Sequence, residues 1–166
     1  MNNVNHLDPG HATTQKGFTL IEILLVIALI AILATITIVA LNPSRQMSQG
    51  KNATRVSNLN TILNAVGQYT LDNKGQLPDS IPTANDGCSG VNADFAICQT
   101  SSTCSTSGVD LRMLTDNGKY LVSIPIDPIA IPGDDSTGYN IVKTDNGRII
   151  VCAPDAELDE IITLTR

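Results

Sequence analysis

The chain has no tryptophan and few other aromatic residues. Its 166 residues include only two phenylalanines and three tyrosines, too few for the stacking surface on which single-stranded nucleic acids bind. Basic residues are also scarce, since ten lysines and arginines against sixteen acids leave a formal net charge of -6. Because phosphate backbones are bound by clustered cations, we expect no direct nucleic-acid partner.

Histidine is nearly absent as well, which bears on catalysis and on metal binding. Its two copies, His6 and His11, lie close to the N-terminus, so the rest of the chain lacks the commonest general base. The sequence has neither a G-x-S-x-G motif nor a phosphate-binding P-loop. Without further histidines or a C-x-x-C pair, a zinc site is not expected either. We therefore expect a protein that is not an enzyme.

The most prominent feature that the chain does have is one long apolar run. Between residues 18 and 41, the only polar side chains are three threonines and Glu22. At about 1.5 Å per residue, a helix of this length measures roughly 36 Å, enough to cross a hydrocarbon core of about 30 Å. In a secretory signal peptide the small-residue cleavage site follows a shorter apolar region, whereas here the small residue Gly17 precedes the run. Cleavage after Gly17 would remove a polar leader, residues 1–17, and leave the membrane helix on the protein.

The residues at the start of this run resemble those of a known family. The segment KGFTLIEILLVIALIAILA is similar to the processing site and helix of type IV pilins and the related pseudopilins, in which a short leader ends in glycine before Phe-Thr-Leu-Ile-Glu. The resemblance implies that a membrane-embedded prepilin peptidase cuts between Gly17 and Phe18 and then methylates the new Phe18 amine. It is close over residues 16–41, and the rest of the chain shares only the general plan of the family.

Glu22 is the only acid in the apolar run. A carboxylate at the centre of a membrane helix costs about 2.5 to 3.5 kcal/mol on insertion scales, and such residues usually mark function. The resemblance implies that Glu22 pairs with the cationic Phe18 amine of a neighbouring subunit and so sets the axial register between subunits. The alternative is that Glu22, one turn from the helix end, only reaches back to the lipid headgroups.

The residues after the run predict a second, amphipathic helix over 42–75. Apolar side chains recur every three or four positions, and turn-forming residues near Gly75 should end the helix. The buried stripe is expected at Val56, Leu59, Ile62, Leu63, Val66 and Tyr69, and polar residues are expected on the other faces at Asn52, Arg55, Asn58, Asn64 and Gln68.

The remainder predicts a small globular head. Residues 76–118 form a loop region rich in turn-forming residues, with a short helix expected after a cap at Asp110, through Leu114 and ending near Gly118. Residues 119–166 should form an antiparallel sheet. Strand candidates lie at 120–124, 139–144, 148–153 and 161–164, and the middle two are joined by the hairpin sequence DNG. The expected fold is α+β, with a long N-terminal helical spine packed on this sheet.

The four cysteines are Cys88, Cys98, Cys104 and Cys152. An even number in a segment predicted to lie outside the membrane indicates two disulfides, with three possible connectivities. We favour Cys98 with Cys104 and Cys88 with Cys152, because the second bond would tie the loop region to the sheet. The alternative is four buried thiols in a reducing compartment.

An acidic loop near the sheet is a weak candidate for a calcium site. Asp127, Asp134, Asp135 and Ser136 could supply oxygen ligands, as the resemblance to G-type pseudopilins implies. Their spacing fits no EF-hand, and a solvated turn, in which aspartate is common, is the favoured alternative. We expect no cofactor other than this possible calcium ion.

Three classes of function are compatible with these features. The first is a structural subunit of a type IV pilus that polymerises through helix 18–41, with a pseudopilin of a type II secretion or DNA-uptake (competence) system as its close variant. The second is a minor pilin with a ligand-binding head, and the third is a membrane-tethered enzyme. The expected partners are other copies of the chain, the prepilin peptidase, the membrane, and the inner-membrane assembly machinery of a pilus or a type II secretion system.

The first class implies a single-pass protein of the inner membrane that moves, on assembly, to a surface pilus or a periplasmic pseudopilus. One observation opposes this topology. Lysine and arginine favour the cytoplasmic side, yet Lys16 alone flanks the run on its N-terminal side, against Arg45, Lys51 and Arg55 on the other. The processing motif is the more specific signal, so we expect the head to lie outside the cytoplasm.

Overall fold

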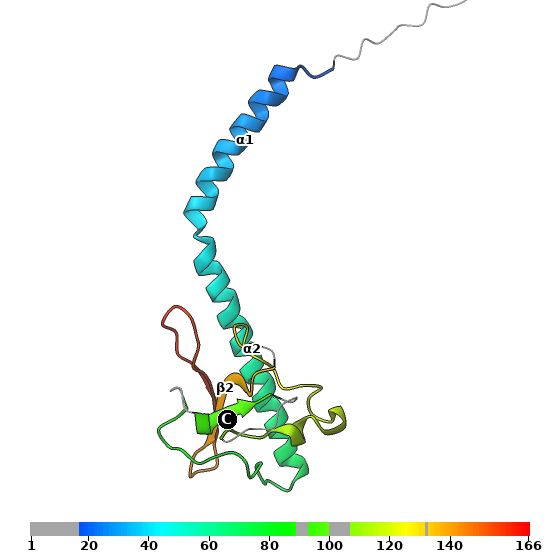
Figure 1. Ribbon diagram of the computed structural model, residues 1–166, viewed down its shortest axis with the longest axis vertical. Helices are drawn as coiled ribbons and strands as arrows, with labels where there is room; N and C mark the ends of the chain where they lie inside the picture. The colour runs from blue at the N-terminus through cyan, green and yellow to red at the C-terminus, as the bar shows by residue number, and fades with distance from the viewer. Residues whose placement is uncertain (1–16, 89–92, 100–106, 132) are drawn as a thin grey trace, which may run out of the picture. The chain divides into compact units, whose positions relative to one another are not determined.

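The computed structural model describes residues 17–88, 93–99, 107–131 and 133–166 (Figure 1). The chain divides into two compact units, Met1–Asn42 and Pro43–Arg166. We call the second unit the head and describe each unit by itself.

The described part of the first unit contains one helix, α1, Leu20–Leu41. Thr19 caps its start. Its backbone is extended, and its side-chain oxygen accepts the Glu22 N–H at 3.3 Å, which satisfies one of the free N–H groups of the first turn. Asn42 ends the helix with a φ of 42°, a left-handed conformation that asparagine adopts more readily than most residues. The helix therefore begins two residues after the start of the apolar run.

The two threonines in the second half of α1 are compatible with an apolar environment. The Thr35 hydroxyl donates to the Ala31 carbonyl at 2.8 Å, and the Thr37 hydroxyl donates to the Ala34 carbonyl at 2.9 Å. Both polar groups are thus satisfied within the helix itself, as the interior of a bilayer requires.

The head begins with helix α2, Pro43–Asp72. Proline suits the first helical position, because its fixed φ matches the helix and its missing N–H would have no partner there. The helix ends where the backbone turns left-handed at Lys74 and Gly75, with the Gly75 N–H donating to the Thr70 carbonyl at 2.8 Å. This is the 6→1 bond of a Schellman motif, in which Lys74 takes the left-handed position that is usually a glycine, and it agrees with the end expected near Gly75.

The buried face of α2 differs from the expected apolar stripe. It consists of Asn52, Arg55, Leu59, Ile62, Leu63, Ala65 and Val66. The expectation was wrong for Val56, which is 39% exposed, and for Asn52 and Arg55, which were expected on the outer faces. Burial of these two polar side chains is possible because loops of the head supply their hydrogen-bonding partners, as buried polar groups require.

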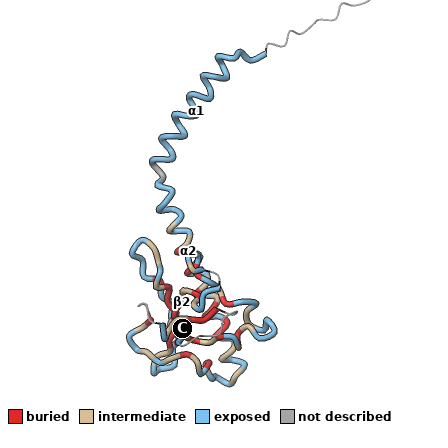
Figure 2. The backbone as a smooth tube through the Cα atoms, in the orientation of Figure 1, coloured by how far each residue is buried: buried red, intermediate tan, exposed pale blue. Residues whose placement is uncertain are grey.

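Four antiparallel strands form one sheet in the order β1-β2-β3-β4. Their bounds are β1 Ala96–Cys98, β2 Ser136–Lys143, β3 Ile149–Ala153 and β4 Ile162–Thr165. One face of the sheet packs on α2, and residues such as Leu59, Ile62, Tyr139 and Ile141 form the core between them. The buried residues cluster there in Figure 2. A long helix packed on a small antiparallel sheet confirms the α+β prediction.

The strand predictions were right for the second half of the sheet and wrong for the first. β2 and β3 form the hairpin expected around Asp145-Asn146-Gly147, and β4 lies at the expected edge. Residues 120–124 do not form a strand. The Leu121 N–H closes a turn onto the Leu114 carbonyl at 3.0 Å, and Pro125 cannot donate to a ladder. The edge strand next to β2 is β1 instead, and β1 lies within the region that was expected to be loop.

The short helix expected between the Asp110 cap and Gly118 is replaced by two 3-10 turns, η2 Arg112–Leu114 and η3 Asp116–Gly118, of which the second ends at the expected residue. Asp110 still acts at the start of the first turn, because its carboxylate accepts the Arg112 N–H at 2.9 Å.

A disulfide joins Cys88 to Cys152, which is the connectivity favoured from the sequence. It ties the segment after α2 to strand β3. Cys98 is also disulfide-bonded, and its expected partner, Cys104, lies outside the described residues.

Candidate functional site

The expected processing site lies in open, non-helical backbone. Gly17 and Phe18 precede the Thr19 cap of α1, Phe18 is 80% exposed, and no atom of another residue would crowd a side chain at Gly17. Exposed, irregular backbone is where proteases cut most readily. The junction between Gly17 and Phe18 is therefore accessible.

Glu22 lies in the first turn of α1, one turn after Phe18. An acid is favoured there because the helix dipole places partial positive charge at the N-terminus. Within the described part of the chain, no hydrogen bond or ion pair engages its carboxylate. The carboxylate is thus open to a cation from outside the chain.

The surface of α1 is apolar on all sides. The span Leu20–Val39 has a mean hydropathy of 2.9, and none of it is buried. Figure 2 shows the helix exposed over this span. By length and composition it can cross a membrane, a test that a signal sequence near the N-terminus also passes. The small residue Gly17 precedes this helix, whereas the cleavage site of a secretory signal peptide follows its apolar region.

The head contains a buried ion pair between α2 and the loop before β2. The Arg55 guanidinium donates to both carboxylate oxygens of Asp127, from Nε at 2.7 Å and from Nη2 at 3.0 Å, and both side chains are 0% exposed. Such two-pronged pairs combine charge with a fixed geometry. The hydrogen bond to Asp127 raises the pKa of Arg55 above its usual value. The Ile129 N–H also donates to Asp127, at 3.0 Å.

Asn52, one turn earlier, binds the turn between β3 and β4. Its side-chain oxygen accepts the Glu157 N–H at 3.0 Å, and its amide donates to the Glu157 carbonyl at 2.7 Å and to the Glu160 carboxylate at 3.0 Å. The same oxygen accepts from Arg55 at 2.8 Å. Lys51 pairs with Glu157 at 2.7 Å and lowers the pKa of that carboxyl.

We call these residues the polar clamp: Lys51, Asn52, Arg55, Asp127 and Glu157. The turn that the clamp holds is strained, because Leu158 and Asp159 have φ values of 64° and 55°, which side chains such as leucine rarely adopt. The clamp therefore fixes two loops of the head to the first half of α2.

These contacts change the interpretation of the acidic loop. Asp127, one of the calcium candidates, is committed to Arg55 on both oxygens. The carbonyl of Asp135 accepts the Gln99 N–H at 2.9 Å. Among the described residues, no three histidine, cysteine or acidic side chains are grouped to hold a metal ion. Calcium binding by Asp134 and Asp135 stays a prediction.

The sequence reasoning missed the clamp, although a signal was present. Asn52, Arg55, Leu59, Ile62 and Val66 follow one another at alternating spacings of three and four, the spacing of one helical face. Polar residues that continue an apolar stripe in this way indicate a buried polar contact.

An exposed Gly-Phe junction, an apolar helix with an acid in its first turn and a head in which a helix packs on a sheet are features typical of type IV pilins and pseudopilins. Residues 13–38 match the family model of the prokaryotic N-terminal methylation motif. The type II secretion system core protein G of Escherichia coli (strain K12) is 36% identical over 73 residues, which cover 44% of this chain and 46% of that protein. The chain thus spans about half the length of this relative. No solved structure is significantly similar to this chain.

The matched motif and the relative both support a type IV pilin or pseudopilin. They point to structural subunits, and the methylation motif together with the apolar helix indicates insertion into a membrane.

Proposed function

We propose that this protein is a structural subunit of a type IV pilus, which polymerises through α1 after cleavage between Gly17 and Phe18. The observation that carries the proposal is α1 itself, because every described side chain from 17 to 39 is exposed. A helix that is apolar on all sides requires lipid or other helices around it. A bundle of α1 helices from neighbouring subunits supplies that environment outside the bilayer.

Glu22 gives such a bundle a defined register. Methylation leaves the Phe18 amine cationic, and a pair of opposite charges about 4 Å apart at an effective dielectric constant of about 20 attract each other by about 4 kcal/mol. This is at least as large as the cost of about 2.5 to 3.5 kcal/mol for a carboxylate at the centre of a membrane helix, and Glu22 lies in the first turn, where the cost is smaller. Pairing between subunits therefore offsets the insertion cost, and it does so only when neighbours are correctly aligned.

A pseudopilin of a type II secretion system is the second candidate. The similarity to a type II secretion core protein favours it. In either case the partners are further copies of the chain, the prepilin peptidase that removes residues 1–17, and the inner-membrane assembly machinery. The subunit is located in the inner membrane before assembly, and after assembly it is part of a surface filament or of a periplasmic one.

Two measurements on cells test the proposal. Mass spectrometry of the membrane-bound protein should find a methylated N-terminus at Phe18, and an intact Met1 end on assembled protein would contradict it. Electron microscopy of wild-type cells should show long surface filaments built from this chain. Short filaments confined to the periplasm would favour the second candidate.

A variant of Glu22 tests the role of the acid. Glu22→Val should insert normally, because removing a membrane acid makes insertion easier, while few filaments form. Thr35→Val is the matched control, since it also removes a polar group from α1 but leaves the charge pair intact. Normal filament numbers with Glu22→Val, at normal levels of membrane-bound subunit, would refute the pairing.

A further inference from the structure

The two ends of the sheet differ in how their outer edges are covered. At β1, the Cys98 N–H donates to the Val109 carbonyl at 3.1 Å, and the Val109 N–H donates to the Ala96 carbonyl at 2.8 Å. The segment around Val109 thus covers that edge. At the other end, β4 pairs with β3 on one side, and none of the described segments pairs with its outer side. Within the described part of the chain, the outer edge of β4 is therefore open.

The register of β4 shows which backbone groups point outward. Ile149 of β3 and Arg166 exchange both backbone hydrogen bonds, each at 2.9 Å. Hydrogen-bonded and non-hydrogen-bonded pairs alternate along an antiparallel ladder, so Thr163 and Thr165 direct their N–H and C=O groups away from β3. Ile161, which is 84% exposed, continues this series. An edge of this kind is a template for another strand.

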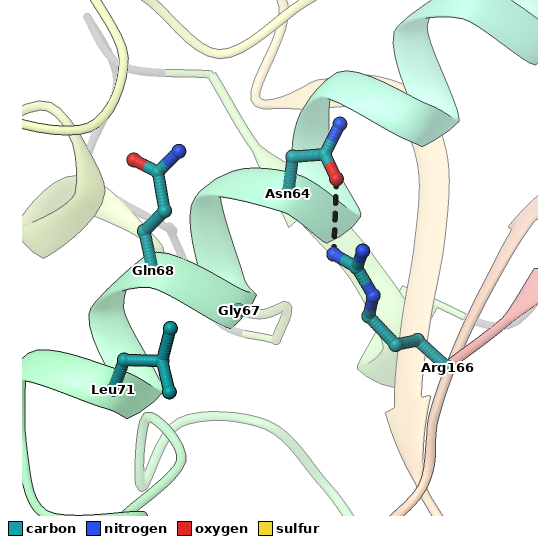
Figure 3. Close-up of a pocket in the computed structure, with 5 residues that line it drawn as sticks. All are labelled: Asn64, Gly67, Gln68, Leu71 and Arg166. Carbon is teal, nitrogen blue, oxygen red and sulfur yellow. Dashed lines mark hydrogen bonds between the residues drawn. The ribbon is translucent and has the colours of Figure 1, made fainter.

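Opposite charges flank the open edge. Glu160 precedes β4 and accepts a hydrogen bond from Asn52 at 3.0 Å. Arg166 follows β4 and donates to the Asn64 side chain at 2.9 Å across Gly67 (Figure 3). A side chain at Gly67 would lie 3.2 Å from the guanidinium, so the glycine lets Arg166 lie close to α2. Both partners are neutral amides, which position the two charges without neutralising them.

We propose that the open edge of β4 pairs with β4 of a second copy of this chain, in an antiparallel register centred on Thr163. A two-fold axis at Thr163 places Ile161 opposite Thr165, so outward-pointing backbone groups face each other, as a ladder requires. The same axis places Glu160 opposite Arg166 at both ends of the pair. Opposite charges directly across a ladder stabilise it.

Neighbouring registers lack this complementarity. An axis at Ile162 or Leu164 also aligns the outward-pointing groups. With the axis at Ile162, however, Glu160 faces Leu164, and with the axis at Leu164, Arg166 faces Ile162. A parallel arrangement in register would place like charges opposite each other. The acid at one end and the base at the other are thus self-complementary only in the antiparallel register centred on Thr163, which identifies a second copy as the partner.

The proposed contact is separate from assembly through α1. A two-fold contact uses the same surface on both copies and closes on itself, so it joins two subunits, or two filaments side by side, and does not extend a filament. The inference therefore depends on β4 and not on the proposed function.

Cysteine cross-linking of the full-length protein in membranes tests the register. Two tagged copies would carry Ile161→Cys and Thr165→Cys, respectively. Directly opposite residues of a hydrogen-bonded pair have Cα atoms about 5.5 Å apart, within the disulfide range of about 4.4 to 6.8 Å. Equal positions on the two copies would be about 13 Å apart along the strands. Cells that contain both variants, the mixed pair, should form a disulfide-linked dimer. Cells that contain only one variant should not. Equal cross-linking of all combinations, or none of the mixed pair, would overturn the proposal.

A charge exchange supplies an independent readout. Glu160→Arg and Arg166→Glu should each reduce cross-linking of the mixed pair several-fold, because like charges then face each other, and the double variant should restore it. The two residues lie about 20 Å apart along one strand, so restoration cannot arise within one chain. Asp155→Arg, an equal charge change in the same loop, is the matched control. A double variant that cross-links as poorly as the single variants would also overturn the register.

Discussion

Replacing Asp127 with alanine should destabilise the head severely. The substitution leaves the Arg55 guanidinium 0% exposed and without the two bonds of 2.7 and 3.0 Å that it makes to the carboxylate. Removing one partner of a buried ion pair typically costs about 3 to 5 kcal/mol, because the other charge stays buried and uncompensated. A domain of ordinary stability has roughly 5 to 15 kcal/mol in total. The variant should therefore lose a large fraction of its stability and unfold at a markedly lower urea concentration than the wild type.

The same helix offers a matched control. Lys51 and Glu157 form an ion pair of the same length, 2.7 Å, but their side chains are 36% and 23% exposed. Exposed pairs contribute about 0 to 1 kcal/mol, so Glu157→Gln should change stability little. The double variant Arg55→Leu with Asp127→Ala should recover much of the loss, since apolar side chains can replace a buried pair without leaving a bare charge.

Urea unfolding of the full-length protein in detergent micelles, followed by pulse proteolysis, measures these differences. The expected order of stability is wild type and Glu157→Gln together, then the double variant, then Asp127→Ala. A loss below about 1 kcal/mol for Asp127→Ala would refute the reasoning, because it would mean that water or other groups solvate Arg55 as well as Asp127 does.

Three further predictions concern the head. Gly138→Ala should destabilise the head by more than about 2 kcal/mol, because Gly138 has a φ of 82° and a Cβ there would lie 2.8 Å from Cβ of Asp127. Gly133→Ala is the control, since Gly133 has a φ of 97° and open space around it, so that this variant has the backbone strain alone. Equal urea midpoints for the two variants would show that the close approach to Asp127 costs nothing. Burial raises the pKa of Tyr139 from 10.0 to about 12, so the folded state holds a proton that the unfolded state releases, and stability should fall as pH rises from about 10 to 12; Tyr139→Phe should flatten this fall in urea titrations, and an unchanged slope would assign it to other groups. Alkylation without reductant should label none of Cys88, Cys98, Cys104 and Cys152, whereas reduction should expose four thiols by mass spectrometry, and labelling of the native protein would indicate a reducing compartment.

The features that the sequence predicts well are those set by local chemistry. Helix α1 follows from one long run in which nearly every residue is apolar, and the β2–β3 hairpin follows from the turn residues Asp145-Asn146-Gly147. The end of α2 near Gly75 follows from turn-forming residues and a glycine with a φ of 88°. Each of these depends on residues that are neighbours in the chain, so periodicity and turn propensity suffice to find them.

The features that were missed depend on contacts between distant residues. Arg55 and Asp127 are separated by 72 positions, and nothing near either residue identifies the other. The β1 strand has only three residues, too few for a periodic pattern, and it is defined by its pairing with β2. Residues 120–124 have strand-like composition, but a turn to Leu114 and the following Pro125 prevent them from joining the ladder. Tertiary context overrode local preference in each case.

The apolar surface of α1 has a consequence for the reversibility of assembly. Lipid tails are about as apolar as leucine side chains, so moving this helix from a bilayer into a bundle of its own copies changes the hydrophobic free energy little. For a subunit that polymerises as proposed, the membrane is then a reservoir from which subunits can be drawn and to which they can return near equilibrium. Whether subunits move into the filament or back into the membrane is then decided by small polar interactions, such as those of the Glu22 charge, and by the work that the assembly machinery supplies.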